Sequence, residues 1–202
     1  VATVSFTTAG RVEVGGKVVL VMPDESSGAQ HGWRFTDGAS TSTETSGTSN
    51  TPAILFTTPS SSKPTGTAVV YTLSTRTLVF TVGANDLAQG ASHVFTISNV
   101  LTPSSVVGVN NMVATTQDSE DKSVDTTSTM STDQITAGAL TSASFATATD
   151  TPGFESVATV SFTTAGRVEV GGKVVLVMAD ESGAQHGWRF TDGASTSTET
   201  IG

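Results

Sequence analysis

The chain has 202 residues and is acidic, with 18 Asp and Glu against 9 Lys and Arg, so that its net charge is −9. It holds 37 Thr and 26 Ser but no Cys, a composition that favours β-strands joined by polar turns and excludes disulfides and Cys-based zinc sites. The basic residues are scattered singly, which argues against a nucleic-acid partner, and no apolar run approaches the roughly 18 residues of a membrane span.

Short apolar runs, several of them alternating with polar residues, predict strands along the chain. Val18–Met22 is apolar on both faces, so we expect it in the middle of a sheet with its outer face covered as well. Polar turns around 74–76 and 118–122 predict two hairpins, and Gly15-Gly16 predicts a tight turn. No helical period extends over 12 residues. The expected strands are 2–7, 18–22, 33–35, 53–56, 69–73, 78–82, 95–97, 112–116, 123–127 and 139–146.

The beginning and the end of the chain are nearly identical. The segment 1–47 recurs as 157–202, a period of 156 residues, with three differences: Ala179 replaces Pro23, Ser27 has no counterpart, and Ile201 replaces Ser46. Two interpretations follow: one duplicated segment or engineered tandem, or a window on a long array of near-identical units. We favour the array.

Composition also predicts how the chain divides. The Ser/Thr-rich segment 126–133 has the character of a linker, so we assign one β-sandwich unit to 1–134, lacking its own first strand, and a linker with the first strands of the next unit to 135–202. We therefore expect neighbouring units to share strands, with residues from about Ile135 packing against an adjacent unit. The competing interpretation is a simple string of ordinary domains.

A family resemblance rests on four segments in this order: VATVSFTTAG, GGKVVLVMPD, HVFTISNVLTPSS and ATTQDSEDKSVDTTS. Together they resemble the repeats of very large surface proteins of algae, other aquatic protists and bacteria. The resemblance implies an all-β fold, an immunoglobulin-like antiparallel β-sandwich repeated in tandem within secreted or surface-attached fibres. It carries over no catalytic residue and no cofactor.

Candidate sites are few. Carboxylates at Asp118, Glu120 and Asp121 suit calcium, but they lack the EF-hand spacing and have Lys122 among them, so a solvated hairpin tip is the competing interpretation. His31 and His93 are too few for a metal site, and we expect His93 at a strand edge. Large aromatic side chains predict core anchors at Trp33, Phe35, Trp188 and Phe190.

Two runs rich in Ser and Thr have a mucin-like composition, so they are candidates for O-linked glycans, with unmodified polar loops as the alternative. The candidate residues are Ser40, Thr41, Ser42, Thr43, Thr45, Ser60, Ser61 and Ser62.

These features predict a non-enzymatic structural repeat of an extracellular or cell-surface filament. Its main partner would be identical units, assembled through packing of strands between units. The alternative from another class is the stalk or binding module of an adhesin, which would attach to carbohydrate or to a surface.

Overall fold

The computed structural model describes residues 1–23, 32–35, 49–50, 52–166, 168, 172–178, 188 and 190. The chain divides into two compact units, Val1–Arg167 and Val168–Gly202. The described part is all-β, and its one helical element is the 3-10 turn η1 (Leu73–Thr75). No helix in that part is of a length and hydropathy suited to crossing a membrane.

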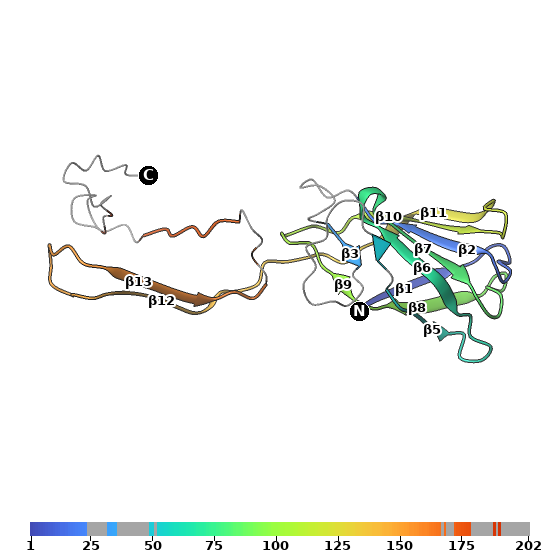
Figure 1. Cartoon of the computed structure of the whole chain (residues 1–202), viewed down its shortest axis with the longest axis horizontal. Helices are drawn as coiled ribbons and strands as arrows, with labels where there is room; N and C mark the ends of the chain where they lie inside the picture. Colours follow the sequence, from blue (N-terminus) through green and yellow to red (C-terminus); the bar gives the residue numbers. More distant parts are fainter. Residues whose placement is uncertain are drawn as a thin grey trace. The chain divides into compact units, whose positions relative to one another are not determined.

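Within the larger unit, two antiparallel sheets pack in the manner of a β-sandwich (Figure 1). The first has the order β1-β8-β5, with β1 (Ala2–Thr7) at one edge, β8 (Ser92–Ile97) in the middle and β5 (Ile54–Thr58) at the other edge. The second sheet has the order β11-β10-β2-β7-β6-β4. Its strands are β11 (Ser123–Ser131), β10 (Asn111–Gln117), β2 (Lys17–Val21), β7 (Thr77–Val82), β6 (Gly66–Thr72) and β4 (Ser49–Asn50).

Alternation of side chains explains why these segments become strands around one core. In β7, Leu78, Phe80 and Val82 are buried while the intervening residues are half-buried, the period-2 pattern of a strand with one face on the core. Phe80 reaches across to Phe56 and Phe95 of the other sheet, with ring centroids 6.0 and 5.1 Å away. The two sheets therefore share one aromatic core.

The predicted centre and hairpins are confirmed. β2 lies in the middle of the six-stranded sheet, and its outward residues are half-buried rather than fully covered. β6 and β7 form an antiparallel hairpin through η1, closed by Arg76 at φ 55°. β10 and β11 form the second hairpin, and Gly15 makes its turn with φ 93°. A short pair, β3 (Arg34–Phe35) with β9 (Val100–Leu101), adds Phe35 to the core.

The linker prediction for 126–133 is wrong. Residues up to Ser131 belong to β11, and beyond it Ile135 forms an isolated bridge in which it and Val107 exchange both backbone hydrogen bonds. Ile135 also packs on the core of the first sandwich, so the expectation that residues from about Ile135 pack against an adjacent unit is wrong at that residue. Thr is a good strand former when one face is exposed and the backbone has a partner. Pairing with β10 therefore makes 126–131 part of a strand, although the composition of this segment predicted a flexible linker.

A separate hairpin follows, made of β12 (Thr141–Thr147) and β13 (Ala158–Thr163). β12 is the strand predicted at 139–146, and β13 opens the second copy of the repeat. Most side chains of both strands are exposed. In the smaller unit, 173–177 repeats the sequence of β2, yet the structure shows no strand there, and Val174 to Val177 are 50–90% exposed. The chain holds no second copy of β7 or β10, the strands that flank β2.

Candidate functional site

The carboxylates predicted at the tip of the β10–β11 hairpin hold the turn together. Asp118 accepts hydrogen bonds from the backbone N–H of Glu120 and of Lys122, both at 2.9 Å. Asp121 forms an ion pair with Lys17 of β2. Within the described residues, no three Asp, Glu or His side chains gather in a way that could hold a metal ion. One oxygen each of Asp118 and Asp121 thus has a partner within the protein, and both contacts hold the hairpin tip in place.

Asp125 serves a different purpose, because it ties the end of β1 to β11. Its Oδ1 accepts a hydrogen bond from Gly10 N at 3.0 Å, and its Oδ2 accepts one from Thr116 Oγ1 at 3.1 Å. A Cβ on Gly10 would lie 2.5 Å from Val124 Cγ1, so any larger residue there would force Val124 or the backbone to move. The clamp draws the segment that follows β1 onto the edge of the six-stranded sheet.

The remaining candidates divide between core and surface. Trp33 and Phe35 are buried, whereas Trp188 and Phe190 of the second copy are 50% and 59% exposed. Phe35 packs edge-on against Tyr71 of β6, with ring centroids 5.1 Å apart, and this chain has no second counterpart of Tyr71. Ser60, Ser61 and Ser62 are all exposed in the loop between β5 and β6. His31 and the glycosylation candidates in 40–45 lie outside the described residues.

His93 is not the edge residue that the sequence suggested. It lies on β8, the middle strand of its sheet, with 1% of its surface exposed, because it follows the inward period of Phe95 and Ile97. Its ring packs against Phe6 and Phe56, at 5.9 and 6.4 Å between centroids. Neither ring nitrogen has a hydrogen-bond partner in the described structure.

Burial lowers the pKa of His93, because the charged imidazolium loses its hydration. The unfolded chain therefore binds the proton more tightly than the folded one, and the free energy of unfolding should rise with pH. We expect full stability above about pH 6.5, the ordinary pKa of His, and a progressive loss below it. Urea unfolding at pH 5 and 7.5 would measure this; His93→Phe should flatten the difference, and an unchanged difference in that variant would contradict the prediction.

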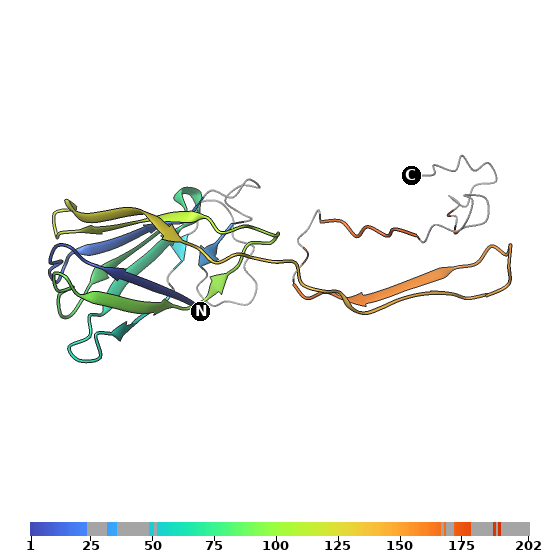
Figure 2. The same ribbon diagram turned by 180° about the vertical axis from the view of Figure 1, so that it is seen from behind.

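The most open feature of the sandwich is the outer edge of β1. In the described part of the chain, β1 pairs with β8 only. Thr8 N donates to Ala91 O, and Thr8 O accepts from Gly90 N. Because backbone groups of alternate residues point to opposite sides of a strand, the unbroken register from Thr8 to Ala2 directs Thr7, Ser5 and Thr3 away from β8. No strand in the described part of the chain pairs with the edge to which their N–H and C=O groups point; β1 is the dark-blue strand in Figure 2.

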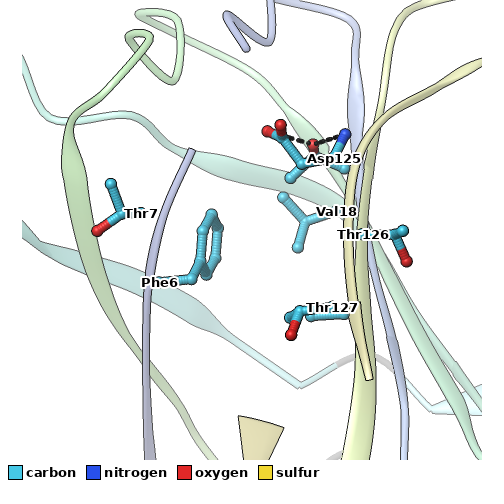
Figure 3. Close-up of a pocket in the computed structure, with 8 residues that line it drawn as sticks. Phe6, Thr7, Val18, Asp125, Thr126 and Thr127 are labelled. Atoms are coloured by element: carbon cyan, nitrogen blue, oxygen red, sulfur yellow. Dashed lines mark hydrogen bonds between the residues drawn. The ribbon is translucent and has the colours of Figure 1, made fainter. Parts of the chain in front are cut away.

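A groove runs beside this edge, between β1 and the β10–β11 hairpin. One cavity of about 70 Å³ is lined by Phe6 and Thr7 on one side and by Val18, Ala114, Thr116 and residues 125–127 on the other. Figure 3 shows the Phe6 ring turned toward Val18 and Thr127 across this space. A second cavity, of about 310 Å³, is lined by Thr3, Val4, Ser5, Met112, Met130 and Ser131. We call the two together the edge groove.

The edge groove combines apolar side chains with unpaired backbone groups, the two things that an added strand requires. The sequence predicted a first unit that lacks its own first strand, but it did not show that the resulting edge lies beside the β10–β11 hairpin, because that depends on the order of strands in space. No family model matches the chain, and neither does any curated protein or solved structure. The resemblance to surface-protein repeats therefore remains a prediction.

Proposed function

We propose that this chain is part of a structural repeat array, a tandem series of immunoglobulin-like sandwiches that builds an extracellular filament. The observation that carries the proposal is the near-identity of the two copies at positions where the fold does not require it. The outward residues Thr3, Ser5 and Thr7 recur as Thr159, Ser161 and Thr163. A sandwich needs only its inward residues to be apolar, whereas identical outer surfaces give every unit the same contacts with its neighbours.

The topology supports the same proposal. Free strand edges are the usual sites at which β proteins associate. The first copy presents such an edge together with a groove, and the chain beyond Ile135 forms a hairpin whose side chains take no part in the core of the first sandwich. An array in which one repeat completes the next gives these features a role.

Imaging the native assembly tests this function. We expect antibodies against the sandwich to decorate extracellular filaments at regular intervals along their length. Decoration confined to the base of an adhesive fibre, with a tip of different sequence, would favour the adhesin stalk. Absence of the protein from surface filaments would overturn the proposal.

A further inference from the structure

The outward face of the six-stranded sheet carries a continuous layer of Val and Thr. In the register of the strands, Val19 of β2 stands opposite Val79 of β7 on one side and Thr115 of β10 on the other. Opposed residues of an antiparallel pair lie on the same face, so the layer extends across five neighbouring strands, β11, β10, β2, β7 and β6 (Figure 1). We call it the Val/Thr face. Its valines are Val19, Val21, Val70, Val79 and Val113, and threonines of the same strands lie between them.

These valines remain accessible in the sandwich. Val70 and Val113 are each 37% exposed, and the other three are half-buried. All five lie on strands that have a neighbour on both sides, so the face does not depend on a free strand edge. The solvent face of an antiparallel sheet is usually polar. A contiguous apolar patch in its place is a typical mark of an interaction surface.

Threonine hydroxyls on this face already have partners in the protein. Thr67 Oγ1 donates to Thr81 O at 3.3 Å, and the hydroxyls of Thr115 and Thr126 form a hydrogen-bonded pair at 3.2 Å. Removing water from a polar group is costly mainly when no other partner replaces the water. Another surface can therefore cover these threonines at a small cost in free energy.

The distribution of charge indicates what can cover the face. The chain has a net charge of −9, yet β2, β6, β7 and β10 contain no Asp or Glu. Their one charged residue is Lys17, which forms an ion pair with Asp121. Two copies of an acidic chain repel one another least where acidic residues are absent. The Val/Thr face is therefore a surface on which a second copy of the chain can approach.

The size of the face limits the strength of such a contact. Five strands about 4.8 Å apart, each presenting about five residues at 3.4 Å per residue, give a surface of roughly 400 Å² per copy. Two stacked copies would cover about 800 Å², which is in the range of weak and transient interfaces. A single pair of units should therefore associate weakly, whereas two arrays that repeat the face in every unit would bind through many such contacts at once.

We propose that the Val/Thr face stacks on the same face of a second copy of this chain, and that this contact holds neighbouring filaments side by side. The proposal deepens the structural function and rests on it for its biological setting. The two sheets pack face to face about 10 Å apart around a two-fold axis, as the layers of a sandwich do. Val19 and Val21 recur as Val175 and Val177, so an array carries these residues in each repeat.

Single lysine substitutions test the face at positions where the fold tolerates them. Val70→Lys and Val113→Lys each add an ammonium group to a residue that is already 37% exposed. Stacking would bury this charge without a partner, which costs far more free energy than leaving it in water. Leu55→Lys is the matched control, because Leu55 is 65% exposed on β5 of the other sheet. Urea unfolding of each variant checks that the sandwich is intact.

Sedimentation equilibrium of the full 202-residue chain, at concentrations up to about 1 mM, measures the association. We expect the wild type and Leu55→Lys to form dimers with the same dissociation constant. Val70→Lys and Val113→Lys should associate at least about tenfold more weakly. Raising the salt concentration should tighten the wild-type dimer, because salt screens the repulsion between two acidic chains.

Three outcomes overturn the stacking. The first is a wild-type chain that stays monomeric at about 1 mM in both low and high salt. The second is association of a folded Val70→Lys or Val113→Lys variant equal to that of the wild type, which would place the contact on another surface. The third is an equal loss in Leu55→Lys, which would show that any exposed apolar residue contributes as much. If one of the two test variants fails to fold, the other decides.

These failures are distinct from failure of the proposed function. A chain that dimerises through the Val/Thr face but is absent from native filaments overturns only the function. A chain found in native filaments whose association is unaffected by Val70→Lys and Val113→Lys overturns only the stacking.

Discussion

Replacing Phe95 by Ala is expected to lower the free energy of unfolding by about 3–5 kcal/mol. Phe95 is fully buried on the middle strand of its sheet and contacts three other rings. Its centroid lies 6.1 Å from Phe6, 5.1 Å from Phe56 and 5.1 Å from Phe80. Phe80 belongs to the opposite sheet, so the substitution leaves a cavity between the sheets that neither can close without moving the other.

Phe154→Ala provides the control for this prediction. It removes the same side chain from a position that is 63% exposed, and substitutions at such positions change stability by no more than about 0.5 kcal/mol. Urea unfolding of both variants, followed by intrinsic fluorescence, measures the difference. Equal midpoints for the two variants would show that the aromatic cluster does not hold the sheets together.

The strands around this cluster could be predicted because their burial alternates. β7 and β10 each bury every second residue, and alternation of apolar with polar or small residues is the signal that sequence carries for a half-buried strand. The segment Thr126–Ser131 lacks that signal. Its strand depends on backbone hydrogen bonds to β10 and on a side chain such as Met130 that only partly covers the core, so the local sequence contains too little information to predict it.

The location of the candidate site escaped prediction for a related reason. Strand sharing was expected from the phase of the repeat, but the edge groove beside β1 depends on which strands are neighbours in space. His93 shows the same limit in reverse. Its polar ring predicted an edge, but its place in the inward period of β8 brings it into the aromatic core. Whether the His93 side chain is buried depends more on its register in β8 than on its own polarity.

Replacing Trp33 by Ala is expected to cost about 3–5 kcal/mol as well. Trp33 is 9% exposed and belongs to the core, and its backbone oxygen accepts a hydrogen bond from the Tyr71 hydroxyl at 3.1 Å. Tyr71 in turn packs on Phe35, so the indole helps to bury a hydrogen bond that joins β6 to the residue before β3. Removing it exposes that hydrogen bond and the ring beside it to water.

The repeat again supplies the matched control, Trp188→Ala, at the corresponding position of the second copy. Trp188 is 50% exposed, so the same substitution there should change the free energy of unfolding of the sandwich by no more than about 0.5 kcal/mol. Thermal or urea unfolding followed by circular dichroism compares the two variants without relying on tryptophan fluorescence. If Trp33→Ala unfolds at the same point as Trp188→Ala, then Trp33 is not an anchor of the core. We expect a clear difference instead, because Trp33 is 9% exposed and Trp188 50%, and because Trp33 covers the contact between Tyr71 and Phe35.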